Sequence, residues 1–200
     1  MGDANRRKLG AHGDRLEGRI MYEDTLKLVL SAPSRKPARS LSRRLDALFG
    51  RLARAPDAPA ASQIEDVIWG IWMSNEDQDA EERLERATRA MANGDDDEAE
   101  ALLDELVATH PDFAEAWNKR ATLYFRQRRD AESVRDIARA LELEPRHFGA
   151  ICGFGQICLR HGDGVMALFA FDAALRINPH LGSIRAAVEE LAAQRTGTAH

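Results

Sequence analysis

The feature that most constrains this chain is a sequence period of 34 residues. Three prolines, Pro111, Pro145 and Pro179, follow one another at this spacing. Four further columns of small or apolar residues repeat with the same period: Ala87, Ala121 and Gly155; Ala99, Ser133 and Ala167; Leu103, Ile137 and Phe171; and Val107, Leu141 and Leu175. A period of this length, carried by residues at helical spacing, indicates helix–turn–helix units that stack on one another.

Each column has a physical role in such a unit. Small residues allow two paired helices to approach closely, and proline cannot continue a helix, so it ends each unit. Large rings such as Trp117 and Tyr124 fill the space between the helices. We therefore expect Trp117 to be buried. Gly94 and Gly162 suit the tight turn inside a unit, where the second unit has Arg128 instead.

The second unit has the fullest pattern, and its members share the packing role: Trp117, Ala121, Tyr124, Ser133, Ile137, Ala140 and Pro145. The third and first units repeat it less completely, with Gly155, Cys158, Ala167, Phe171, Ala174 and Pro179, and with Ala87, Ala99, Leu103 and Pro111. This pattern resembles the tetratricopeptide repeat (TPR) family over residues 80 to about 195, and small bacterial TPR proteins of unassigned function over residues 112–155. The resemblance implies an all-α fold, a right-handed α-solenoid of about three repeats with flanking helices.

The period also suggests boundaries. We expect three repeats at 80–113, 114–147 and 148–181 within a domain of residues 79–195, followed by a capping helix at 182–195 and a frayed tail at 196–200. Before them, residues 41–78 predict a helical hairpin, with helices at 41–54 and 62–74, that caps the repeats. Trp69 and Trp72 are expected to pack against the first repeat. Residues 1–40 read as a mostly disordered arm with a candidate short helix at 19–30.

Charge is distributed unevenly along the chain. The net charge of −5 combines +6 over residues 1–60 with −11 over residues 61–200. A basic arm on an acidic body could bind nucleic acid, an anionic membrane or the body itself. The acidic repeats argue against a nucleic-acid platform, and the densest basic cluster, at residues 35–44, lacks interleaved aromatic residues. No apolar run is long enough to span a membrane, so no membrane insertion is expected.

The sequence shows no strong catalytic or metal-binding constellation. The acidic run at 95–98 lacks the alternating oxygen ligands of a calcium loop and reads as a solvated helix start. Histidines at 110, 147 and 180 flank the repeat-ending prolines and are expected in loops. Cys158 and His161 could form a thiol–imidazole pair, but Cys158 occupies the interior column of Tyr124, so a buried structural thiol is favoured. We expect no enzyme activity, no metal, no cofactor and no small-molecule substrate.

The TPR resemblance implies a binding groove lined by the first helix of each repeat. In the second and third repeats the implied groove residues are Asn118, Thr122, Phe125, Arg126, Cys152, Gln156, Leu159 and Arg160. The same residues also fit ordinary exposed helix positions. Lysines that the family uses to clamp chaperone carboxylates are absent there, while Arg126 and Arg160 suit a carboxylate. Cys152 is expected in the groove and therefore to be more reactive than Cys158.

These observations favour a non-catalytic scaffold that holds a partner protein or an extended peptide, with an acidic or C-terminal segment in the groove. A cytoplasmic location is expected. Two alternatives remain: an exported, periplasmic TPR adaptor in envelope assembly, which the resemblance suggests, and a nucleic-acid-associated regulator that uses the basic arm.

Overall fold

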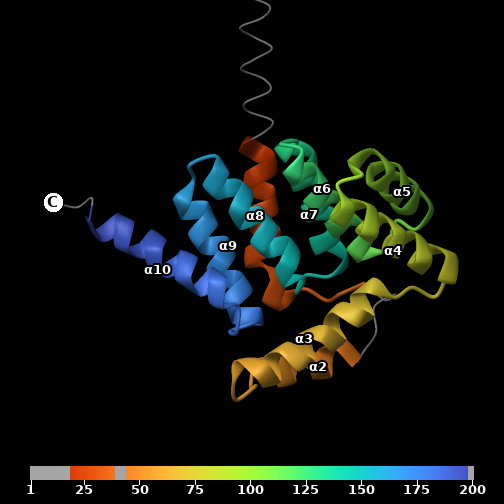
Figure 1. The fold of residues 1–200 in the computed structure, drawn as a ribbon. Coiled ribbons are helices and arrows are strands. Elements are labelled where there is room, and N and C mark those ends of the chain that lie inside the picture. Colours follow the sequence, from red (N-terminus) through yellow and green to blue (C-terminus); the bar gives the residue numbers. More distant parts are fainter. Residues whose placement is uncertain (1–18, 39–43, 198–200) are drawn as a thin grey trace, which may run out of the picture.

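The structure, a computed structural model, describes residues 19–38 and 44–197, with side chains up to residue 194. The described residues form helices and no strand (Figure 1). After a helix at 19–30 and a short 3-10 turn, η1 (Ala32–Ser34), come α2 (Arg44–Leu52), α3 (Ala58–Met73), α4 (Gln78–Asn93), α5 (Asp96–Thr109), α6 (Ala114–Arg126), α7 (Asp130–Leu143), α8 (Phe148–Arg160), α9 (Gly164–Ile177) and α10 (Gly182–Gly197). The chain is an all-α solenoid.

The repeated core consists of three successive helical pairs, α4–α5, α6–α7 and α8–α9. The small columns make their close approach possible. A Cβ atom at Gly155 of α8 would overlap the Phe171 ring of α9. In the second pair, the Ser133 hydroxyl donates a hydrogen bond of 2.7 Å to the carbonyl oxygen of Ala121, so serine satisfies its polar group where the other pairs have alanine.

The turn inside each pair is the same at the backbone level. Gly94, Arg128 and Gly162 lie 34 residues apart and all have positive φ, at 84°, 64° and 77°. This left-handed conformation ends the first helix of the pair, and arginine adopts it at a cost that glycine avoids.

Trp117 is half-buried, so the expectation of a buried ring is wrong. Its indole Nε1 donates to the carbonyl oxygen of Pro111 at 3.1 Å, and the Arg120 guanidinium lies 5.0 Å from the ring centre. Arg120 is held in turn by two hydrogen bonds to the buried Asp136, of 2.7 and 2.9 Å. The second pair thus encloses an ion pair beside the tryptophan.

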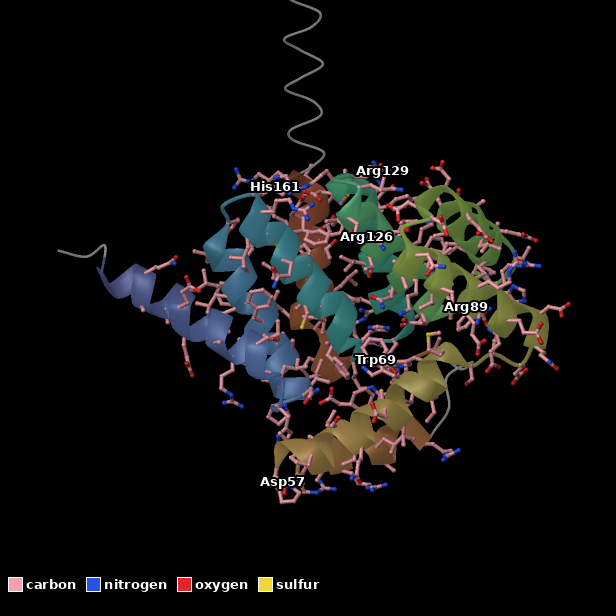
Figure 2. All side chains as sticks on the ribbon, in the orientation of Figure 1. Asp57, Trp69, Arg89, Arg126, Arg129 and His161 are labelled. Carbon is pink, nitrogen blue, oxygen red and sulfur yellow. The ribbon has the colours of Figure 1, made fainter. Side chains whose placement is uncertain are left out.

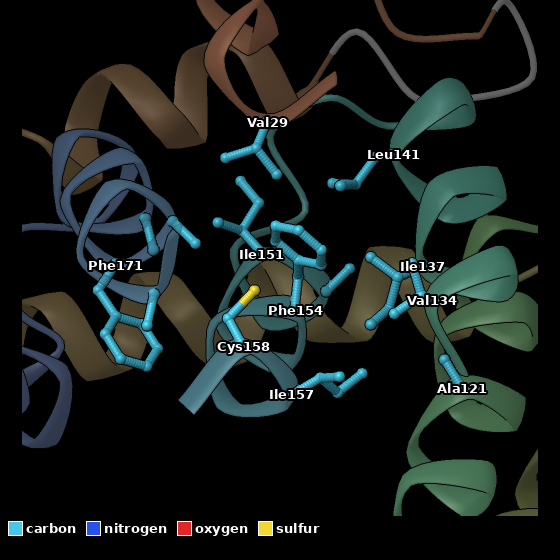
Figure 3. Close-up of a cluster of buried hydrophobic side chains, with 14 of the residues drawn as sticks. Val29, Ala121, Val134, Ile137, Leu141, Ile151, Phe154, Ile157, Cys158 and Phe171 are labelled. Carbon is cyan, nitrogen blue, oxygen red and sulfur yellow. The ribbon is translucent and has the colours of Figure 1, made fainter. Parts of the chain in front are cut away.

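The helix at 19–30 packs between α7 and α9 across α8 (Figure 3). Val29 is fully buried in the same cluster as Leu141, Ile151, Phe154 and Phe171. The segment continues along α7, where the amide of Ala38 donates to the carbonyl of Leu143 at 2.7 Å. The candidate helix therefore exists, but residues 19–38 are a packed part of the fold and not a loose arm. Residues 1–18 lie outside the described residues.

The hairpin of α2 and α3 projects from the body below the repeats, with Asp57 at its tip (Figure 2). α3 begins at Ala58, four residues before the predicted start, because Asp57 caps it by accepting a 2.9 Å hydrogen bond from the amide of Ala60 and Pro59 is tolerated in its first turn. At the other end of the chain, α10 packs Ile184 and Leu191 into the core beside α9 and continues to Gly197, into the segment that was expected to fray.

Candidate functional site

The first helices of the three pairs, α4, α6 and α8, together present what we call the repeat face. Thr88, Thr122 and Gln156 form one row across it, of which Thr122 and Gln156 are exposed and Thr88 is half-exposed. A second row contains Met91, Phe125 and Leu159, of which Phe125 and Leu159 are half-buried and Met91 is buried. Both rows repeat every 34 residues, so neighbouring helices offer equivalent positions to one ligand.

The two arginines predicted for the groove, Arg126 and Arg160, form hydrogen bonds with other residues of the protein. Arg126 donates from Nη1 to the Met91 carbonyl at 2.7 Å and from Nη2 to Asp96 at 2.9 Å. Arg160 repeats the arrangement one unit later: Nη1 donates to the Phe125 carbonyl at 3.0 Å and to a carboxylate oxygen of Asp130.

Each arginine therefore ties its first helix to the preceding pair, and Arg160 also lies 3.5 Å over the Phe125 ring. The sequence suggested that both side chains suit a carboxylate of a ligand, whereas in the structure each binds a carboxylate of the protein itself. Reversing both charges would break contacts between repeats as well as any contact with a ligand.

The hairpin covers one end of the repeat face. Trp72 of α3 stacks on the His147 ring, with centres 4.1 Å apart and planes 8° apart. A Cβ atom at Gly149, the first turn of α8, would lie 2.8 Å from the Trp69 ring. The expectation that these tryptophans pack against the first repeat is therefore wrong: they pack where α8 begins, as Figure 2 shows for Trp69.

A buried polar pair lies beneath this contact. His147 and Glu115 are both 0% exposed, and their Nε2 and Oε2 atoms are 2.8 Å apart. His147 Nδ1 accepts the amide hydrogen of Ala150 at 3.2 Å, which leaves Nε2 to donate to the carboxylate. His147 thus caps the N-terminus of α8 and forms part of the surface on which the hairpin packs. The sequence predicted a loop position for His147 but not this role.

Glu115 also organises the predicted groove residue Asn118. The Asn118 amide donates to both carboxylate oxygens, at 3.3 and 3.2 Å, and is buried. Lys119 completes the group, with Nζ 3.4 Å from Oε1 of Glu115. The predicted groove residues therefore separate into a closed end with Asn118 and an open end with Thr122 and Gln156.

The thiols do not form a nucleophilic site. Cys158 is fully buried and Cys152 is partly buried, and burial raises the pKa of each thiol to about 12. His161 lies 2.8 Å from Asp130 through Nε2, and its ring packs edge-on against Tyr22. A thiolate is the nucleophilic form of cysteine, so these positions oppose the thiol–imidazole alternative.

The acidic run and the basic segment each contribute a residue to contacts within the protein. Asp96 of the acidic run binds Arg126. Arg35 of the basic segment donates to the carbonyls of Leu141 and Glu142, at the C-terminal end of α7, where a cation is favoured. Within the described ranges, no cluster of three or more His, Cys, Asp or Glu residues could hold a metal ion. No helix of the described residues has the length and apolar character to cross a membrane.

Comparisons with known proteins agree with this geometry. The tetratricopeptide repeat family matches residues 80–123 and residues 114–147. A TPR repeat-containing protein of Rhizobium etli is 34% identical over 163 residues, which cover 82% of this chain and 80% of that protein. The 34-residue columns, the three stacked helical pairs and this identity lead to one conclusion: the chain belongs to the tetratricopeptide repeat family.

Proposed function

We propose that this chain is a non-catalytic scaffold that holds an extended segment of a partner protein across the open end of the repeat face. Its TPR repeats support a general role as a protein–protein interaction scaffold. The segment crosses α4, α6 and α8 roughly at right angles to the helices. The closed end is already filled by the chain's own hairpin, through Trp69 and Trp72.

The observation that carries this proposal is the pair of parallel rows on the repeat face. An extended chain alternates its side chains, so it can place polar backbone groups and apolar side chains on adjacent tracks. Thr122 and Gln156 offer polar groups on one track, and Phe125 and Leu159 offer apolar surface on the other.

The hydrogen-bonding capacity of the polar row suits a peptide backbone. The hydroxyls of Thr88 and Thr122 donate to the carbonyls of Leu84 and Asn118 at 2.8 and 2.9 Å, which leaves their oxygens to accept. Gln156 has both a donor and an acceptor on its exposed amide.

Charge has a smaller part in this proposal than the sequence suggested. Asp96 and Asp130 already compensate Arg126 and Arg160. An acidic or C-terminal segment would gain less from these guanidinium groups than from free ones, because carboxylates of the protein already neutralise them. The proposal therefore depends on backbone and apolar contacts.

Site-specific photo-crosslinking tests the proposal. Benzoylphenylalanine would replace Thr122 or Gln156 in the full chain, and Ala131, an exposed residue of α7 outside the repeat face, would be the matched control. Irradiation in the native cells should give the same partner protein at positions 122 and 156 and none at 131. Adducts at 131 as abundant as those at 122 and 156 would refute the repeat face as the binding surface.

A further inference from the structure

A second candidate binding site lies on the hairpin, away from the repeat face. A cavity of about 530 Å³ is lined by residues near the tip of α2 and α3: Leu48, Arg51, Arg54, Ala55, Pro56, Ala60, Gln63, Ile64 and Val67. We call it the hairpin pocket. Its volume falls in the range of cavities that bind ligands, about 300–1,000 Å³.

The floor of the hairpin pocket is apolar. Leu48 and Ile64 are nearly buried, whereas Val67 is 42% exposed. α3 faces the repeats with Trp69 and Trp72 and faces α2 with Ile64 and Ile68, whereas Val67 lines the pocket outside this cluster of described residues. An apolar group that entered the pocket would remove Val67 from water, which is favourable.

The rim is positively charged. Arg51 and Arg54 are exposed and form no ion pair with any described residue, in contrast to arginines of the repeats such as Arg120, Arg129 and Arg160. The pocket lining contains no carboxylate.

One nearby carboxylate belongs to Asp57, which is occupied as the cap of α3 through the amide of Ala60. The two arginines of the lining outnumber this one carboxylate, so the rim is locally positive in a protein whose net charge is −5. Two neighbouring guanidinium groups are suited to grip one carboxylate, because each offers parallel donors.

We propose that the hairpin pocket binds an acidic segment of a partner protein in which a carboxylate-bearing residue lies beside a large apolar residue. The apolar side chain packs against Leu48, Ile64 and Val67, and the carboxylate bridges Arg51 and Arg54. This site is separate from the repeat face and does not require the function proposed above.

Fluorescence anisotropy with defined peptides tests the proposal on the full chain. The probe is a fluorescein-labelled peptide in which leucine alternates with glutamate, and the comparison peptide has lysine in place of glutamate. The acidic peptide should bind and the basic one should not. Arg51→Glu should weaken binding by about tenfold or more and make the remainder less dependent on salt.

Two matched variants separate the pocket from the rest of the surface. Arg135→Glu makes the same charge change at an exposed arginine of α7 and should leave binding unchanged. Val67→Ser should weaken binding several-fold, whereas Val165→Ser, at a valine of α9 that is 49% exposed, should not. Circular dichroism should show native helix content in all four variants.

Three results would overturn the proposal. The first is equal binding of the acidic peptide by Arg51→Glu and Arg135→Glu. The second is self-association in analytical ultracentrifugation that Arg51→Glu abolishes, because the occupant would then be a second copy of this chain. The third is binding to phosphatidylserine vesicles without binding to the acidic peptide, which would make the pocket a lipid site.

Discussion

Arg128 illustrates how the repeat geometry constrains a single residue. It has φ of 64° in the turn where the first and third pairs have Gly94 and Gly162. A left-handed conformation costs a residue with a side chain about 1–2 kcal/mol. The second unit therefore carries a local strain that its neighbours avoid.

Arg128→Gly should stabilise the protein by about 0.5–1 kcal/mol, since relief of this strain exceeds the extra entropy that glycine gives the unfolded chain. The free energy of unfolding from urea denaturation measures the change. The reciprocal control, Gly162→Ala, should destabilise by about 1 kcal/mol. A loss of stability in Arg128→Gly would show that the arginine side chain is needed for contacts that outweigh the strain.

A second prediction at this scale concerns pH. Hydrogen bonds from Arg129, at 2.6 Å to each carboxylate, hold the pKa values of Glu100 and Glu132 below their ordinary value of 4.5. A lowered pKa in the folded state contributes stability that is present above the unfolded pKa and is lost as pH falls through the folded pKa. Stability should therefore decrease from about pH 5 downwards.

Arg129→Met isolates this contribution from those of other carboxylates. The variant should be less stable than the wild type near neutral pH, and the difference should shrink as pH falls below about 4.5. Urea denaturation at several pH values provides the comparison. A difference that stays constant with pH would mean that Arg129 acts through packing on Tyr124, whose ring centre is 4.1 Å away, and not through the carboxylates.

At the scale of elements, the helix at 19–30 is part of the hydrophobic core. Val29 is 0% exposed and its neighbour Leu30 is 53% exposed, so alanine substitutions at the two positions compare a buried with an exposed side chain of the same helix. Val29→Ala should destabilise by about 2 kcal/mol, since it removes buried carbon atoms and leaves a cavity. Leu30→Ala should change stability by less than about 0.5 kcal/mol.

Limited proteolysis gives an independent readout of the same helix. Native protein should resist cleavage after Lys27, and Val29→Ala should be cut there sooner. Equal cleavage of the two alanine variants would contradict a packed helix at 19–30.

At the scale of the whole molecule, the hairpin is joined to the repeats by a small set of contacts far apart in sequence. Trp72 stacks on His147, and Arg146 binds Asp46 of α2 at 2.6 Å while its guanidinium lies 4.5 Å from the Phe49 ring. Both contacts involve the segment between α7 and α8. This segment therefore fixes where the hairpin sits, and so which part of the repeat face stays open.

Trp72→Ala should cost about 3–5 kcal/mol, the range for emptying a large buried aromatic position. The hairpin should also become more mobile, which hydrogen exchange of α2 and α3 would detect. Val67→Ala, on the exposed side of α3, is the matched control and should change stability by less than about 0.5 kcal/mol. A cost below about 1 kcal/mol for Trp72→Ala would show that the stacked contact does not hold the hairpin.

The sequence by itself determined the repeated core. The 34-residue columns arise from contacts between helices that are adjacent in the chain, such as the contact of Gly155 with Phe171. Each repeat unit must make the same contacts, so each needs the same kinds of residue at the same positions. A periodic requirement leaves a periodic pattern, so the units, their small residues and their turns could be predicted. The TPR resemblance implied that Thr122 and Gln156 lie on the groove side of the first helices, and both are exposed in the structure.

Only the tertiary structure decided how the unrepeated segments and the charged side chains are used. The helix at 19–30 packs against residues more than a hundred positions away, and no period marks such a contact. Arg126 and Arg160 look free in sequence, because the carboxylates that bind them belong to the preceding pair. His147 and Glu115 meet only when the solenoid forms, since a buried polar pair depends on the three-dimensional position of both partners.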